Sequence, residues 1–239
     1  GFEVPARLMH TAGFALYEAK AKGAGSICCF DPEKYAKQKS DIENIRAFSE
    51  LLDKNLFTYH FQPIVSSSTG EIVAYEALMR TKGNIALNPL QILNCAKNFG
   101  RLYDIEKATL NNTLKYLSKH QLDFENRRLY INSISSHALD DKDFYAIVND
   151  YGELLEKVVI EMTEQTEISE DDLDRIRVRL EKNNMSLAID DYGTGYSNTS
   201  NLLRYDPEVV KIDRSLISGK PLHTIDKVNS VLIHIRADI

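Results

Sequence analysis

Short apolar segments that end in a polar side chain recur along this chain, and patterns typical of helices separate most of them. Each segment has the length of a buried strand, and strands that alternate with helices are typical of βα units with a parallel sheet. We therefore expect an α/β fold, a (β/α) barrel whose functional residues lie where the strands end. A doubly wound open sheet is the alternative, although no glycine-rich phosphate fingerprint follows an early strand. The polar residues at the segment ends are Glu76, Asn132, Glu161, Asp190, Asp191, Lys211 and Asp213.

The expected elements divide into a short N-terminal part and a longer region that carries the sheet. The N-terminal part has a helix over 4–22, a strand over 26–30 and a charged amphipathic helix over 35–55. One helix and one strand are too little to bury a core of their own. In the longer region we expect strands over 57–65, 71–79, 128–134, 157–163, 186–190 and 208–212, the first two forming a hairpin, and helices over 89–99, 102–119, 142–151, 169–184, 198–204 and 224–236.

Composition excludes several classes of protein. The chain has 239 residues, of which 43% are hydrophobic, and this is ordinary for a globular protein. A net charge of −6 argues against a binder of nucleic-acid polymers, which would carry a basic stripe, but it permits a small phosphate ligand. Three cysteines, two of them adjacent, fit neither a disulfide framework nor a zinc site. Since neither a membrane-spanning stretch nor a signal peptide is visible, we expect a cytoplasmic location, which is compatible with a membrane anchor in a longer parent protein.

The side chains at the strand ends favour one kind of chemistry. A single Asp-Asp turn is most often a solvated strand end, but five strands that deliver polar groups to one rim indicate a site. Oxygen ligands without histidine or cysteine suit Mg²⁺ or Mn²⁺, and several carboxylates can hold two such ions. Paired ions are suited to phosphoryl chemistry. Lys211 is then either a structural charge balancer or the group that orients and helps deprotonate the attacking water.

Four short motifs follow one another along the chain: YEALMR at 75–80, EMTE at 161–164, DDYGTGYS at 190–197 and KID at 211–213. Together with Gln62-Pro63 on the first strand, they resemble the EAL-domain family, whose members hydrolyse the bacterial messenger cyclic di-GMP. The resemblance covers roughly residues 40–239 and implies a TIM-like (β/α) barrel of the EAL type. It implies a phosphodiesterase that opens cyclic di-GMP to linear pGpG with Mg²⁺ or Mn²⁺.

The resemblance also implies roles for single residues. Asp190 would bridge the first metal ion to a second, which Asp191 also binds. Glu164 would hold the loop 193–196 in its competent shape. Lys211 would help to activate the water. The remaining implied roles are metal ligation by Glu76, Asn132, Glu161 and Asp190 at the first ion, support of the metal water network by Asp213, and contacts to the dinucleotide from Gln62, Leu78 and Arg80, with Arg80 at a phosphate.

The N-terminal part resembles a different family. Residues 12–23 are similar to the last helix of a GGDEF (diguanylate cyclase) domain, with Gly13 where an acidic residue is usual. The cyclase signature itself is absent from the sequence, so no cyclase activity is expected of this chain. We therefore divide the chain into a GGDEF-derived C-terminal fragment (1–34), a linker helix (35–55) and the EAL phosphodiesterase domain (56–239). The parent protein would have an upstream GGDEF domain.

Some residues depart from the family pattern. Thr81 stands where a tryptophan is usual, and Lys97 stands where an acidic residue is usual. The last two βα units of the barrel, with a metal-binding glutamate and a glutamine, would follow Ile239, so we expect weak or no activity from the chain as given. The alternatives are a degenerate EAL domain that binds cyclic di-GMP as a receptor, and a purely structural dimerisation module. The resemblance further implies a homodimer formed through the helix near 198–204.

Overall fold

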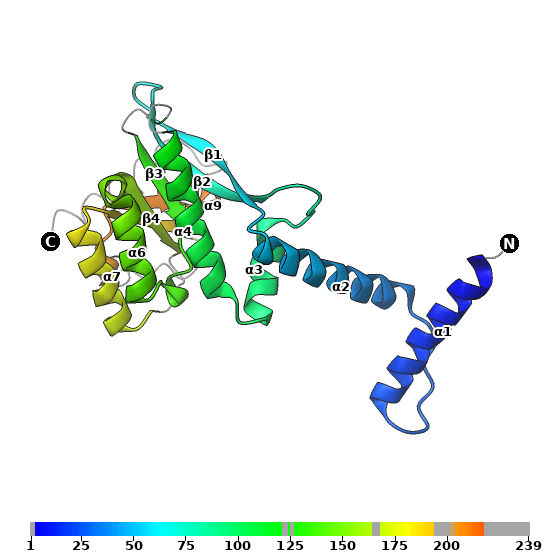
Figure 1. Ribbon diagram of the computed structural model, residues 1–239. Coiled ribbons are helices and arrows are strands. Elements are labelled where there is room, and N and C mark those ends of the chain that lie inside the picture. Colours follow the sequence, from blue (N-terminus) through cyan, green and yellow to red (C-terminus); the bar gives the residue numbers. More distant parts are fainter. Residues whose placement is uncertain are drawn as a thin grey trace.

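The protein is built on one six-stranded sheet in the order β1-β2-β3-β4-β5-β6 (Figure 1). The computed structural model describes residues 3–120, 124, 127–163, 168–193, 202 and 204–217. β1 and β2 form the expected antiparallel hairpin, and the later strands are parallel to β2 and to one another. The strands are β1 (Phe57–Val65), β2 (Ile72–Thr81), β3 (Arg128–Asn132), β4 (Val158–Thr163), β5 (Ser186–Tyr192) and β6 (Val209–Ile212).

Helices cover the outer face of this sheet. α4, α6 and α7 lie against it in Figure 1, and their apolar stripes pack onto outward-facing strand residues. Leu114 and Leu117 of α4 and Leu173 of α7 are completely buried in this layer. The helices are α3 (Pro89–Asn98), α4 (Leu102–Lys119), α6 (Asp141–Tyr151), α7 (Glu170–Lys182) and α9 (Arg214–Ile217), with the 3₁₀ helices η1 (Ser135–His137) and η2 (Gly152–Lys157).

The inner face of the sheet has an apolar layer of its own. It consists of four buried residues on four neighbouring strands, with two partly buried ones packed against them. Because side chains alternate between the two faces of a strand, the residue two positions further on points to the same side. The layer is formed by Ala74, Tyr130, Val159 and Ala188, with Ile64 and Val209. In five of the strands, β2 to β6, the residue two positions after the member of this layer is one of the predicted polar side chains: Glu76, Asn132, Glu161, Asp190 and Lys211.

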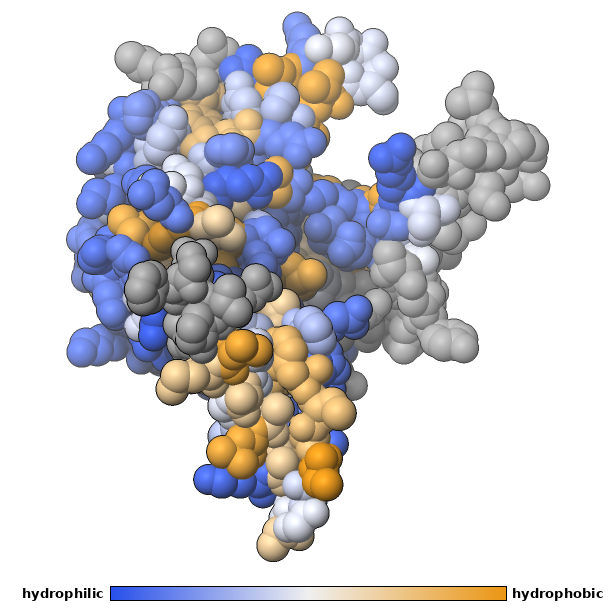
Figure 2. All heavy atoms as spheres, turned by 90° about the vertical axis from the view of Figure 1, so that its right-hand side faces the viewer, coloured by the Kyte–Doolittle hydropathy of each residue, from blue (hydrophilic) through white to orange (hydrophobic). Residues whose placement is uncertain are grey.

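The N-terminal helices form an arm that extends away from the sheet (Figure 1). α1 (Glu3–Lys22) is followed by α2 (Pro32–Asp53), which the Asp31 side chain caps by accepting hydrogen bonds from two backbone amides. Figure 2 shows apolar side chains gathered on this arm. Its large exposed hydrophobic residues are Leu8, Met9, Leu16, Tyr17, Ile27, Ile42 and Ile45.

Two expectations about the elements need correction. The predicted strand over 26–30, part of the expected GGDEF-derived fragment, does not form. A strand requires a hydrogen-bonding neighbour, and no segment of the described residues pairs with this one. β5 also continues beyond Asp190 to Tyr192, so both acids of the Asp-Asp pair lie within the strand.

The remaining expected elements of residues 57–212 are present within two residues of their predicted ends where the structure describes them. Of the helix over 198–204, only 202 and 204 are described, and both are helical. The helix over 224–236 lies outside the described residues. Within the described part of the chain, no helix has the length and apolar character needed to cross a membrane.

Candidate metal centre

Three carboxylates from three strands converge above the apolar inner layer. Glu76 of β2, Glu161 of β4 and Asp190 of β5 each offer an oxygen within 4.8 Å of the other two. The parallel register places Asn132 of β3 opposite Glu161, in the middle of this group. The Asn132 Nδ2 atom donates to Glu76 Oε1 over 3.1 Å. A flip of the amide would turn its Oδ1 atom towards a cation instead.

Lys211 of β6 lies among the three carboxylates. Its Nζ atom is 2.6 Å from Glu161 Oε1, 3.1 Å from Glu76 Oε2 and 3.2 Å from Asp190 Oδ1. One ammonium balances only one of three negative charges, and like charges held this close disfavour ionisation of the group. The cluster therefore favours additional positive charge.

Burial shifts the pKa values in this cluster. Burial of the Glu161 side chain raises the pKa of its carboxyl to about 7, although the hydrogen bond and the charge of Lys211 act in the opposite direction. Burial alone would lower the pKa of the Lys211 ammonium, but Glu161, Asp190 and Glu76 together raise it above its ordinary value. Lys211 is therefore protonated at neutral pH and acts as the cation of the cluster.

The donor set fits a hard divalent cation. The Glu161 Oε2 atom is buried and has no hydrogen-bond partner among the described residues. A buried carboxylate oxygen without a partner is costly, and a cation placed between the three carboxylates would satisfy it. Several carboxylate oxygens held this close together are the ligands that Mg²⁺ and Mn²⁺ prefer.

Asp191 and Asp213 lie near the cluster but outside the group of three carboxylates. The regular pairing of β5 with β6 shifts between Ile189 and Tyr192, and Asp191 has a positive φ of 55°. Such an irregularity re-aims side chains that a regular strand would send to opposite faces. Burial and the charges of Asp190 and Asp213 raise the pKa of Asp191. The Asp213 carboxylate accepts from Ser215 N over 2.7 Å at the start of α9.

The predicted dinucleotide residues share one face of the hairpin. The register pairs Gln62 with Glu76, so the side chains of Gln62, Leu78 and Arg80 alternate to the same side as Glu76. Gln62 is exposed, whereas Leu78 and Arg80 are partly buried. The Arg80 Nη1 atom donates to the carbonyl oxygen of Met79 over 2.7 Å. Glu164 and the loop residues 194–197 lie outside the described residues.

Glu106 is a functional candidate that was not expected from the sequence. This residue of α4 is buried, and its carboxylate accepts hydrogen bonds from the two residues that follow Asn132. A signal existed, because Glu106 falls at helical spacing within the stripe that also contains Thr109, Leu110 and Thr113. A carboxylate on the buried stripe of a helix needs a polar partner.

A model of the EAL domain family matches residues 45–230. The chain belongs to the EAL domain family. The TIM-like (β/α) fold expected for an EAL domain is confirmed by the solved structures that it resembles. One is the EAL domain of FimX from Xanthomonas citri in complex with c-diGMP, which matches with a TM-score of 0.65 and 16% identity over 84% of this chain and 83% of that one.

Two further proteins are similar to this EAL domain. The cyclic di-GMP phosphodiesterase NbdA of Pseudomonas aeruginosa is 27% identical over 227 residues, which are 90% of this chain and 28% of NbdA. The chain thus spans less than a third of the length of this curated relative. BlrP1 of Klebsiella pneumoniae, solved as a manganese/cy-diGMP complex, matches with a TM-score of 0.59 and 22% identity over 69% of this chain and 42% of that one.

Proposed function

We propose that this EAL domain is a phosphodiesterase that hydrolyses cyclic di-GMP to linear pGpG with Mg²⁺ or Mn²⁺. The observation that carries the proposal is the convergence of Glu76, Glu161 and Asp190 around one point, with Asn132 beside them. The name of NbdA supports the substrate, and the manganese/cy-diGMP complex of BlrP1 supports the combination of metal and nucleotide.

The metal ligands at the first position would be Glu76, Asn132, Glu161 and Asp190. A divalent ion held there would activate a water and stabilise negative charge on the phosphodiester oxygens. Lys211, as a protonated donor among these carboxylates, would orient the attacking water towards the phosphorus atom.

Further residues near this metal position would have roles in the same reaction. Asp190 would be shared with a second ion that Asp191 also binds, Glu164 would shape the loop 193–196, and Asp213 would support the water network. Arg80 would pair with a phosphate, since a guanidinium presents two parallel donors to a phosphodiester. Gln62 and Leu78 would line the rest of the dinucleotide site.

The proposed organisation of the chain is the one expected from the sequence. Residues 1–34 would derive from a GGDEF domain, 35–55 would be a linker helix, and 56–239 would be the phosphodiesterase domain. In a longer parent protein an upstream GGDEF domain would be the neighbour, and the region near 198–204 would form a homodimer.

The test is hydrolysis of cyclic di-GMP by this chain and by the longest natural protein that contains it. Chromatographic detection of pGpG with Mg²⁺ or Mn²⁺ is the expected result for the longer protein, and Glu76→Gln should abolish it by removing the negative charge of a metal ligand. Glu43→Gln is the matched control, because Glu43 is an exposed acid of α2. No turnover with either metal would overturn the proposal. Nucleotide binding by calorimetry without turnover would favour the alternative, a receptor that does not hydrolyse cyclic di-GMP.

A further inference from the structure

Glu106 links the outer helix layer to the edge of the sheet that carries the metal centre. It lies on the buried stripe of α4 and is only 3% exposed. Its Oε1 atom accepts a hydrogen bond from Ser133 Oγ over 2.6 Å, and its Oε2 atom accepts from the backbone amide of Ile134 over 2.7 Å. One carboxylate therefore holds both residues that directly follow Asn132.

Ser133 is held from a second side by a metal ligand. Its backbone amide donates to the carbonyl oxygen of Glu161 over 2.9 Å, beyond the regular pairing of Asn132 with Glu161. Asn132 in turn donates from Nδ2 to Glu76 Oε1. A displacement of Ser133 would therefore shift Asn132 through the chain and Glu161 through the hydrogen bond.

The chain after Asn132 depends on these contacts. β3 ends at Asn132, and the next regular element is the three-residue helix η1, so Ser133 and Ile134 lie between two elements. A partly buried amide and hydroxyl that lose their partner leave part of their desolvation cost uncompensated. The Glu106 carboxylate is the acceptor that satisfies both of them.

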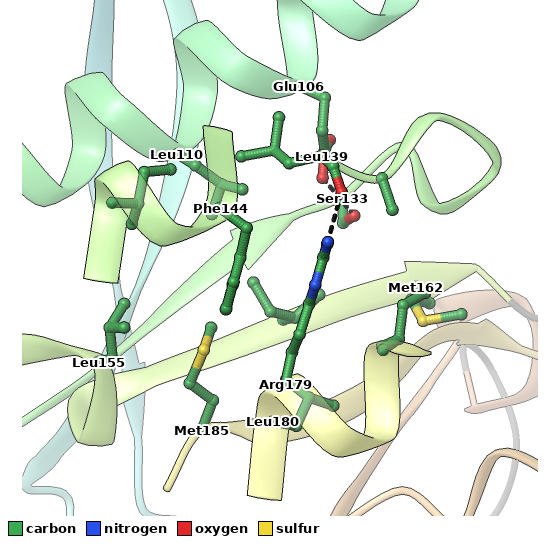
Figure 3. A pocket seen from close by; sticks show the side chains of 14 residues that line it. Glu106, Leu110, Ser133, Leu139, Phe144, Leu155, Met162, Arg179, Leu180 and Met185 are labelled. Atoms are coloured by element: carbon green, nitrogen blue, oxygen red, sulfur yellow. Dashed lines mark hydrogen bonds between the residues drawn. The ribbon is translucent and has the colours of Figure 1, made fainter. Parts of the chain in front are cut away.

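The surroundings of Glu106 leave room for movement. A cavity of about 50 Å³ lies beside it, lined mainly by apolar side chains such as Leu110, Phe144 and Met185 (Figure 3). Arg179 from α7 also lines the cavity, but it donates to the carbonyl oxygen of Leu139. A free Ser133 side chain could therefore turn into open space, where apolar side chains offer it no hydrogen bond.

We propose that Glu106 is a positioning residue which, by holding Ser133 and Ile134, keeps Asn132 and Glu161 in the geometry that binds the metal ion. The proposal rests on the proposed metal-dependent function. Removal of a hydrogen-bonding partner of a metal ligand commonly changes metal affinity or activity by about 10- to 100-fold, and Glu106 acts on Asn132 through the two residues that directly follow it.

The test measures Mn²⁺ affinity, by electron paramagnetic resonance titration without nucleotide, in the protein used for the turnover assay. Glu106→Ala should weaken Mn²⁺ binding by about 10- to 100-fold. Glu106→Gln should stay within about threefold of wild type, because an amide can accept from Ile134 N and donate to Ser133 Oγ. Ser133→Ala removes one of the two hydrogen bonds and should weaken binding by about three- to tenfold, which decides the matter if Glu106→Ala does not fold.

Thr113→Ala is the matched control for a purely structural role. Thr113 is also buried on α4, and among the described residues its hydroxyl donates only within the helix, to the carbonyl oxygens of Thr109 and Leu110. This variant should lose stability and keep its Mn²⁺ affinity. Equal affinities of Glu106→Ala and Thr113→Ala would overturn the proposal, as would equal losses in Glu106→Ala and Glu106→Gln or unchanged binding in Ser133→Ala. Failure of the wild-type protein to bind Mn²⁺ would instead overturn the proposed metal centre itself.

Discussion

At the scale of single residues, Lys211 supplies positive charge to the three carboxylates of the cluster, as a divalent cation would. The Lys211 ammonium contacts Glu76, Glu161 and Asp190, which belong to three other strands. Without a positive charge near them, these carboxylates repel one another in a partly buried place. The charge balance of the metal-free protein therefore depends on Lys211.

Lys211→Met should lower the stability of the protein in the presence of EDTA. Removal of one partner from a buried ion pair commonly costs about 3 kcal/mol or more, since it leaves the other charges uncompensated. Addition of Mn²⁺ should raise the melting temperature of Lys211→Met more than that of wild type, because the metal ion supplies the missing charge. Thermal unfolding followed by circular dichroism gives both values. An unchanged melting temperature in EDTA would contradict this account of Lys211.

At the scale of elements, α1 contributes little to the body of the protein. The side chain of Phe14 contacts the rings of Phe30 and Tyr35, with centroids 6.0 and 5.4 Å apart. Lys34 of α2 lies 3.7 Å from Glu18 as an exposed ion pair, a kind that contributes little to stability. In contrast, the C-terminal part of α2 buries Phe48 and Leu51 in the main core.

A chain that begins at Gly25 should therefore unfold at nearly the melting temperature of the intact chain. This truncation removes α1 with its exposed apolar residues and keeps Asp31, the capping residue of α2. We expect a change in melting temperature of less than about 2 °C, because little buried area of the sheet or its helices is lost. Differential scanning calorimetry of both chains measures it. The comparison chain is the variant Leu51→Ala, which should lose about 2–5 kcal/mol of stability because Leu51 is completely buried. A comparable loss in the truncated chain would show that α1 belongs to the core.

At the scale of the whole molecule, Glu106 couples global stability to pH because the pKa of its carboxyl differs between the folded and the unfolded chain. Burial raises the pKa of its carboxyl from 4.5 to about 7, although the hydrogen bonds from Ile134 and Ser133 act in the opposite direction. Between these pH values the folded state holds a proton that the unfolded state has lost. The contribution of this proton to stability is therefore fully present below about pH 4.5 and disappears as the pH rises through about 7.

Glu106→Gln removes this pH dependence. Relative to wild type, the variant should gain about 2 kcal/mol in the free energy of unfolding between pH 5 and pH 8. Urea denaturation at several pH values measures the difference. Glu43→Gln is the control, because Glu43 is exposed on α2. A difference between Glu106→Gln and wild type that stays constant with pH would contradict the raised pKa.

The positions of the strands along the chain and the identity of the residues at their ends could be predicted from local patterns. Strand periodicity alone determines that Glu76 points to the same face as Ala74, and Lys211 to the same face as Val209. The same reasoning failed for residues 26–30, because an extended, apolar segment becomes a strand only where a neighbouring strand pairs with it. The shift within β5 was also missed, since the register depends on how β6 pairs with it.

The sequence by itself therefore determined which side chains of a strand share one face, because the alternation of a strand is a local property. It also identified the family, through motifs that each occupy a few consecutive residues. Only the tertiary structure decided which of these side chains meet. Glu76 and Lys211 are 135 residues apart, yet their charged atoms lie within 3.1 Å because the intervening strands pair in order. Glu106 acquired its partners in the same way, since the packing of α4 against β3 brings a helix residue to the end of a strand.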